Sequence, residues 1–166
     1  MNRQHEQIRQ AIYDDLSSFE PTFHIPLQFD TNHKPKDIET LKRYVRVVMG
    51  RWERAMLGAR WRRNHITFRM IAEKNAVYGW HGHILLKDQA HNKREIHNKF
   101  QTAKKKPREP IPDLLVLRIK KTPARLHKYV LKHIWPDGTR RIDTSVWIPS
   151  EELFNLSLKP TPTDTP

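Results

Sequence analysis

The sequence predicts an α+β protein with a central five-stranded antiparallel sheet flanked by helices. Five segments have the apolar pattern of strands, and the segments between them place apolar residues at helical spacing. Two of the strand segments are joined by a short polar turn, which indicates an antiparallel hairpin. The predicted order is therefore strand, helix, hairpin, helix, strand, helix, strand, without an internal repeat.

Length and composition fit one folded domain. The chain has 166 residues, of which 37% are hydrophobic, and this is enough for a buried core. We expect the domain to span residues 1–150. Residues 151–166 are expected to form a C-terminal extension that is disordered at its end, "KPTPTDTP".

The charge balance favours a polyanionic partner. The chain has 31 Lys and Arg against 18 Asp and Glu, a formal net charge of +13. Each phosphate that binds such a surface releases a counterion, although a generic basic surface is the alternative. The chain has no cysteine, which suits a reducing compartment. We expect a cytoplasmic or nucleoid protein without a membrane partner, because there is no signal peptide or long apolar run.

The first half of the chain predicts a strand, a helix and the hairpin. "FHIPLQFD" (23–30) alternates apolar residues on one face, and Pro26 favours an edge position or a bulge because proline cannot donate to a ladder. A helix follows over residues 38–56, with Asp37 as its N-cap. "HITFRMIAE" (65–73) and "VYGWHGHILL" (77–86) form the two hairpin strands.

The second half predicts two further helical segments and two further strands around breaks at "KPREPIPD" and "PDGT". The helical segments are 92–106 and 122–135, and the strands are 114–120 and 144–150.

The histidine pair in the hairpin is the first candidate site. His81 and His83 are two apart on a strand, so their side chains share a face while Gly82 points to the other face and allows close approach. A turn near 75–78 would place Glu73 opposite one of them. One carboxylate and two imidazoles with open positions suit Mg²⁺ or Mn²⁺. From these residues alone, a metal site and a solvent-facing histidine pair are equally good interpretations.

Tyr129 and Lys132 form the second candidate site, on one face of the predicted helix 122–135. A phenol with an ordinary pKa of about 10 needs an activated electrophile and cationic neighbours to act as a nucleophile. A metal-polarised phosphodiester beside a lysine provides both. The alternative is a tyrosine in the core or on the surface.

Together these segments resemble the HUH endonucleases, specifically the single-tyrosine replication initiators of rolling-circle plasmids and viruses. "FHIPLQF" is similar to the first strand motif, "WHGHILL" to the metal motif and "KYVLKHI" to the tyrosine motif. The resemblance covers roughly residues 20–150. The chain departs from it at Gly82, where the family has a bulky hydrophobe, and at Pro26.

The resemblance implies a sheet like that of RNA-recognition motifs, with Mg²⁺ or Mn²⁺ held by Glu73, His81 and His83. Tyr129 would attack a phosphate of single-stranded DNA at an origin or hairpin, leaving a 5′-phosphotyrosine and a free 3′-OH. Lys132 would position the phosphate. The reaction would initiate and terminate rolling-circle replication of a plasmid or virus.

Motif order and motif absence refine this interpretation. The tyrosine follows the histidines, as in replication initiators and small single-strand transposases, and the tyrosine helix lacks the glutamine usual in those transposases. Arg125 and His133 occupy the spacings where a second tyrosine would stand. The sequence has no G-x-x-x-x-G-K-[ST] motif, so unwinding would come from supercoiling, an exposed hairpin or a separate helicase.

Basic residues outside these motifs are expected to contact the DNA backbone. They are Arg60, Arg62, Arg63, Lys104, Lys105, Lys106, Arg108 and His133. Two other hypotheses stay open: a non-catalytic basic nucleic-acid-binding module of similar fold, and a single-strand transposase using the same chemistry.

Overall fold

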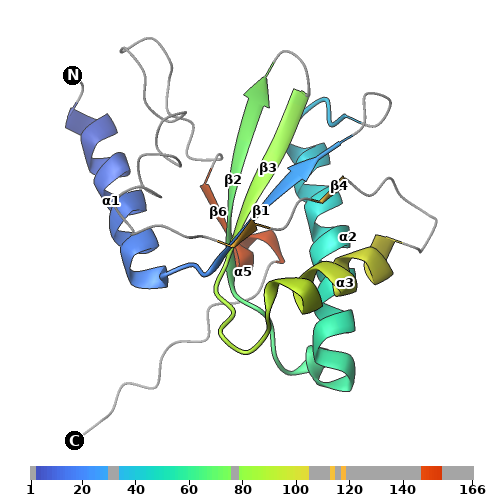
Figure 1. Ribbon diagram of the computed structural model, residues 1–166. Helices are drawn as coiled ribbons and strands as arrows, with labels where there is room; N and C mark the ends of the chain where they lie inside the picture. Colours follow the sequence, from blue (N-terminus) through green and yellow to red (C-terminus); the bar gives the residue numbers. More distant parts are fainter. Residues whose placement is uncertain are drawn as a thin grey trace, which may run out of the picture.

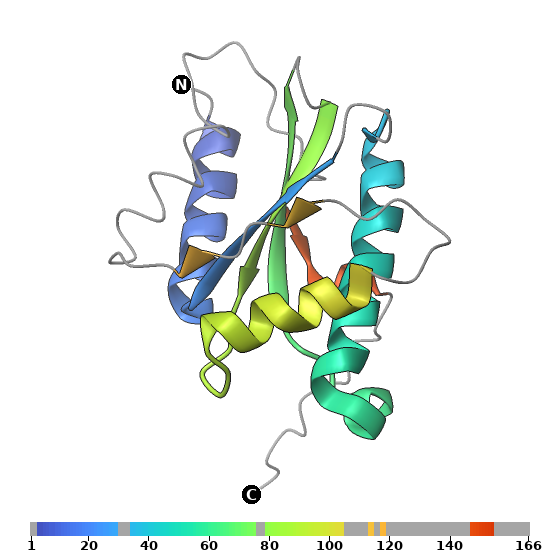
Figure 2. The ribbon, with the colours of Figure 1, turned by 45° about the vertical axis from the view of Figure 1, so that its right-hand side comes forward.

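An antiparallel sheet with helices on both faces makes up the described part of the protein. The computed structural model describes residues 3–29, 34–75, 79–104, 113–114, 117–118 and 147–154. Helix α1 lies on one side of the sheet, and α2 and α3 lie on the other (Figures 1 and 2). In chain order the elements are α1 (Arg3–Phe19), β1 (Phe23–Gln28), α2 (Ile38–Leu57), η1 (Gly58–Arg62), β2 (Phe68–Asn75), β3 (Gly79–Leu86), α3 (Lys93–Lys104), β4 (Asp113–Leu114), β5 (Leu117–Arg118), β6 (Trp147–Pro149) and α5 (Ser150–Leu153).

The sheet has the order β4-β1-β3-β2-β6, with β5 also paired to β1, and every pair is antiparallel. The predicted α+β class and the antiparallel sheet flanked by helices are confirmed. The predicted count of five strands is not, because the described residues contain six strand segments. Two of these, β4 and β5, have two residues each and pair with opposite ends of β1.

The position of Pro26 differs from the prediction. Strand β1 lies inside the sheet, with β3 on one side and β4 and β5 on the other, so Pro26 is not on an edge strand. The register between β1 and β3 also runs through Pro26 without a bulge. Its neighbour Leu27 pairs with both Gly82 and Leu114. Proline removes a single donor, and the pairing of the residues around it holds β1 in place.

The larger core lies between the sheet and helices α2 and α3. The alternation predicted for β1 is confirmed, since Phe23, Ile25 and Leu27 are all buried there. Trp52 of α2 stacks on Phe100 of α3, with ring centroids 4.9 Å apart, and joins the two helices. The predicted N-cap of α2 is also confirmed.

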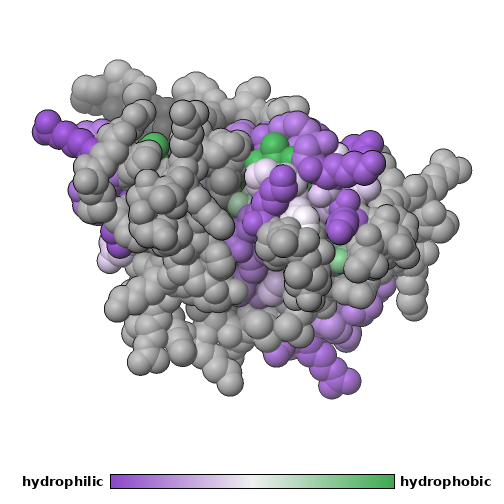
Figure 3. Space-filling view, turned by 90° about the horizontal axis from the view of Figure 1, so that it is seen from above, coloured by the Kyte–Doolittle hydropathy of each residue, from purple (hydrophilic) through white to green (hydrophobic). Residues whose placement is uncertain are grey.

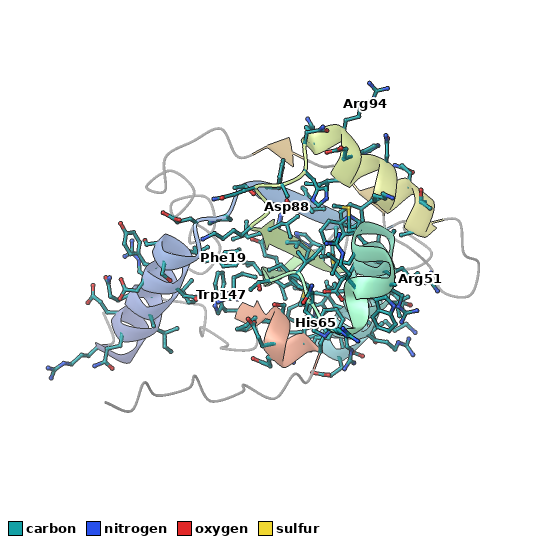
Figure 4. All side chains as sticks on the ribbon, turned by 90° about the horizontal axis from the view of Figure 1, so that it is seen from below. Phe19, Arg51, His65, Asp88, Arg94 and Trp147 are labelled. Carbon is teal, nitrogen blue, oxygen red and sulfur yellow. The ribbon has the colours of Figure 1, made fainter. Side chains whose placement is uncertain are left out.

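Helix α1 was not predicted from the sequence. Its buried residues Ile12 and Leu16 pack on Ile71 and Leu85 of the opposite sheet face. A polar network reinforces this contact. The carboxylate of Asp15 accepts hydrogen bonds from Arg69, at 2.8 and 3.1 Å, and from the Trp147 indole, at 3.1 Å. Figure 4 shows Trp147 in the space between α1 and the sheet.

The other predicted elements lie partly within and partly outside the residues that the structure describes. The hairpin and the helical segment after it are confirmed as β2–β3 and α3. Leu153 of α5 belongs to the main core, so the packed structure continues past residue 150, where the domain was expected to end. The predicted helix 122–135, the turn 136–139 and the end of the C-terminal extension lie outside the described residues. No helix in the described part is both long and apolar enough to span a membrane.

Candidate metal centre

The β2–β3 hairpin brings the predicted metal ligands together. Glu73 of β2 is the register partner of His81 in β3, and His83 pairs with Ile71 two residues further along. Strand β2 ends at Asn75 and β3 begins at Gly79, where the turn was expected. This register places the carboxylate and both imidazoles on one sheet face. The predicted position of Glu73 is confirmed.

The donor atoms are close enough to share a metal ion. The Glu73 Oε2 atom lies 3.3 Å from His81 Nε2 and 3.5 Å from His83 Nε2. Ligands about 2.1 Å from one ion stand about 3.0–3.4 Å from each other at octahedral and tetrahedral angles. The three side chains are only 12–13% exposed. Glu73, His81 and His83 therefore form a group that could hold a metal ion.

Hydrogen bonds at the far side of each ring orient the two imidazoles. His81 Nδ1 donates to the carbonyl oxygen of Gly79 at 3.4 Å. His83 Nδ1 is hydrogen-bonded to His24 Nε2 at 2.9 Å. Both Nε2 atoms are thus directed toward Glu73. Metal-binding histidines usually have this arrangement, in which the second nitrogen is held by a protein group.

Gly82 faces the main core, opposite the histidines. A Cβ atom at this position would lie 3.5 Å from Met70 Sδ and 3.7 Å from Leu27 Cδ1. The side chains of Met70 and Leu27, from the two neighbouring strands, therefore fill the space that a bulky residue would occupy. The close approach expected at Gly82 comes from core side chains.

His24 is a site residue that sequence reasoning missed. It is 9% exposed and lies in β1, where it pairs with Leu85. Leu85 is two residues after His83 in β3. The position of His24 between Phe23 and Ile25, which face the core, placed it on the other sheet face. That alternation was a usable signal, but it needed the knowledge that β1 pairs with β3.

Of the predicted DNA-contacting residues that the structure describes, Arg60, Arg62 and Arg63 lie beyond the end of α2 that is far from the metal centre. Arg60 and Arg62 belong to η1, Arg63 follows it, and the side chains of Arg60 and Arg63 are exposed. Helix α2 separates them from the hairpin end, and its 20 residues span about 30 Å (Figure 1). Lys104 is the last residue of α3. The others, Tyr129, Lys132, Lys105, Lys106, Arg108 and His133, lie outside the described residues.

Other lysines lie at the same end of the sheet as the metal centre. Lys34, Lys36 and Lys74 are exposed there. The Trp80 amide donates to the Pro35 carbonyl at 3.4 Å, which attaches the segment before α2 to the start of β3. Seen from above, the described surface at this end is mainly hydrophilic (Figure 3).

Fold and site together define an α+β protein whose antiparallel sheet carries a candidate metal centre of two histidines and one carboxylate. The chain matches no protein-family model, and comparisons with curated proteins and with solved structures give no significant match.

Proposed function

We propose that this protein is a metal-dependent, site-specific single-stranded DNA endonuclease and strand transferase of the HUH type. The observation that carries the proposal is the Glu73–His81–His83 cluster. These are the three residues to which the resemblance assigns the metal, and their donor atoms lie within 4.8 Å of one another. The proposed role is to initiate and terminate rolling-circle replication of a plasmid or virus.

The sheet order supports an HUH-type core. Strands β4 and β5 both run antiparallel to β1, on the side opposite β3. Both pair with β1 in a single register, Leu27 with Leu114 and His24 with Leu117, so they occupy the same position across the sheet. The sheet then has five positions across it, as expected for a core like that of RNA-recognition motifs.

The donor set suits a divalent cation of the hard or borderline type. A carboxylate oxygen and two neutral imidazoles accept Mg²⁺ or Mn²⁺, and three protein ligands leave positions for phosphate oxygens. The ion supplies Lewis-acid polarisation of the scissile phosphate. The three side chains bind and orient it.

Tyr129 is the proposed nucleophile. Its phenol oxygen forms a bond to phosphorus while the bond from phosphorus to the 3′ oxygen breaks. The phenol proton passes to solvent, and the leaving 3′ oxygen takes up a proton as a free 3′-OH. Lys132, three residues further along the chain, would hold the phosphate. No water is consumed, so the reverse step can rejoin DNA.

The positive charge supports single-stranded DNA as the partner. At the metal end, Lys34, Lys36 and Lys74 are exposed and available for phosphate contacts. Arg60 and Arg63 are exposed at the other end of α2, where a longer strand would reach them.

Covalent capture tests this function. We would incubate the protein and Mn²⁺ with labelled hairpin-bearing single strands of randomised flanking sequence, stop the reaction with EDTA and separate the products under denaturing conditions. A labelled adduct should form with the wild type and be absent in Tyr129→Phe. Tyr13→Phe, on helix α1, is the matched control and should form it.

The other outcomes distinguish the alternatives. His81→Ala should abolish the adduct and retain most DNA binding. Tight binding by the wild type without an adduct on any strand would overturn the proposal in favour of a non-catalytic binding module. Sequencing the captured strands separates a replicon nick site from a transposon end.

A further inference from the structure

We infer that His24 is a positioning residue of the metal centre, which holds His83 in the tautomer whose Nε2 carries no proton and can bind the metal ion. The inference rests on the proposed metal site and adds a residue that the ligand set does not contain. The observation that supports it is the hydrogen bond between His24 Nε2 and His83 Nδ1, at 2.9 Å.

The two rings meet across the β1–β3 pair. His24 is opposite Leu85, and His83 is two residues away on the same strand face. The ring centroids are 5.0 Å apart and the ring planes are inclined by 33°. This geometry directs one nitrogen of each ring at the other ring.

The tautomer of His83 follows from which of its ring nitrogens faces the Glu73 carboxylate. His83 Nε2 is the nitrogen that lies 3.5 Å from Glu73 Oε2, so it is the metal-binding atom. A neutral imidazole that binds through Nε2 carries its proton on Nδ1. His83 Nδ1 must then donate, and His24 Nε2 must accept.

His24 is held more firmly than a loop residue would be. It lies in β1, where its backbone is in register with Leu85 on one side and with Leu117 on the other. A partner fixed in this way limits rotation of the His83 ring. It also makes the ring a better ligand, because the hydrogen bond increases the basicity of Nε2.

His24 supports the centre without belonging to the ligand group. Within the described part of the chain, the residues whose donor atoms gather for one ion are Glu73, His81 and His83. His24 Nε2 is directed at His83 Nδ1 instead. His81 has the equivalent support from a backbone carbonyl, that of Gly79, at 3.4 Å.

A matched pair of substitutions tests the inference. The side chains of Gln and Met have similar length and volume, but the Gln amide oxygen is a strong acceptor for the proton of His83 Nδ1 and the Met sulfur is a weak one. We would measure Mn²⁺ affinity by isothermal titration calorimetry for the wild type, His24→Gln and His24→Met, together with the melting temperature of each metal-free protein. We expect His24→Met to bind Mn²⁺ about 10–100-fold more weakly than the wild type and His24→Gln to recover most of this loss.

The outcomes separate this inference from the proposed metal site. If the wild type does not bind Mn²⁺, the metal site itself fails. If the wild type and His24→Met bind Mn²⁺ equally well, the metal site stands and the role of His24 is wrong. The same conclusion follows if His24→Met lowers only the metal-free melting temperature.

A measurement on the wild type keeps the inference testable if His24→Met does not fold. In the Zn²⁺-loaded protein, NMR should show the Nδ1 proton of His83 protected from exchange with water. A Zn²⁺-loaded protein without a protected proton on His83 Nδ1 would overturn the inference.

Discussion

Glu73 and His81 face each other across the β2–β3 hairpin, with Oε2 and Nε2 3.3 Å apart. His83 Nε2 approaches the same oxygen atom at 3.5 Å. A carboxylate oxygen and two imidazole lone pairs repel one another at such distances unless a proton or a cation lies between them. The arrangement is therefore suited to binding a cation, and binding should be measurable as stabilisation.

Mn²⁺ should raise the melting temperature of the wild type and should not change that of Glu73→Gln. A ligand that binds only the folded state contributes about 2.7 kcal/mol at 100 times its dissociation constant. The amide of Gln removes the negative charge and keeps the size of the side chain. The measurement is thermal unfolding with and without Mn²⁺. Glu39→Gln, on the exposed surface of α2, is the control and should keep the full shift. An equal shift in Glu73→Gln would contradict the metal assignment.

Substitutions at Gly82 should affect the core and not the metal centre. Gly82→Ala places a Cβ at ordinary contact distance from Met70 and removes the flexibility of glycine, so the free energy of unfolding should rise by about 0.5–1 kcal/mol. Gly82→Leu should lower it by about 1–3 kcal/mol through overpacking. Urea unfolding measures both changes.

A second substitution checks the reason. Adding Met70→Ala to Gly82→Leu should recover part of the lost stability, since Met70 occupies the space that the new side chain needs. Additive losses in the double variant would show that Met70 is not the obstacle. Mn²⁺ affinity should stay within about threefold of the wild type in Gly82→Ala, because the substitution lies on the opposite sheet face.

The hairpin was predictable because its determinants are local. A short connection fixes the register of two adjacent strands, and the two-residue period then decides which side chains share a face. Glu73, His81 and His83 could be placed together on this basis. Tyr129 comes 46 residues after His83 in the chain, so no short connection fixes its place relative to the histidines, and it lies outside the described residues.

The features that were missed depend on non-local contacts. His24 meets His83 only because β1 pairs with β3, and 59 residues separate them in the chain. Pro26 was expected on an edge strand or at a bulge, but the pairing of its neighbours outweighs one missing donor. Helix α1 places Ile8, Ile12 and Leu16 at intervals of four residues, a narrow stripe whose burial depends on docking. Such a helix is hard to distinguish from a polar tail until its sheet partner is known.

Leu16→Ala should lower the free energy of unfolding by about 2–3 kcal/mol, at the low end of the range for buried leucines. The side chain is buried against Ile71 and Leu85, and the loss leaves a cavity in the small cluster between α1 and the sheet. Urea unfolding is the measurement. Gln7→Ala, on the exposed side of α1, should change stability by less than about 0.5 kcal/mol. Equal stability of the wild type and Leu16→Ala would show that α1 does not contribute to the folded unit.

The N-cap of α2 should make stability depend on pH in the acid range. The Thr40 backbone N–H donates to Asp37 at 2.7 Å and holds the pKa of Asp37 below its ordinary value of 3.8. A lowered pKa in the folded state means that the stabilisation is complete above 3.8 and is lost as pH falls through the lower value.

Asp37→Asn keeps the hydrogen-bond acceptor without the titrating charge. The wild type should therefore lose more stability than Asp37→Asn between about pH 5 and about pH 2. Unfolding by urea at several pH values measures the difference. Parallel curves for the two proteins would contradict an effect of this carboxylate.

A basic residue far from the metal centre should contact DNA only when the strand is long enough to reach it. For single-stranded DNA, each phosphate contact that is removed reduces the slope of log affinity against log salt concentration by about 0.7. Lys34→Gln with Lys74→Gln should thus reduce the slope by about 1.4, even on a short strand centred on the nick site. Arg60→Gln with Arg63→Gln changes residues beyond the far end of α2, a helix about 30 Å long. This second pair should reduce the slope only on strands long enough to reach η1.

Fluorescence anisotropy with short and long strands at several salt concentrations is the measurement. A slope that changes equally for both pairs on the short strand would place the DNA path along α2 rather than at the hairpin end.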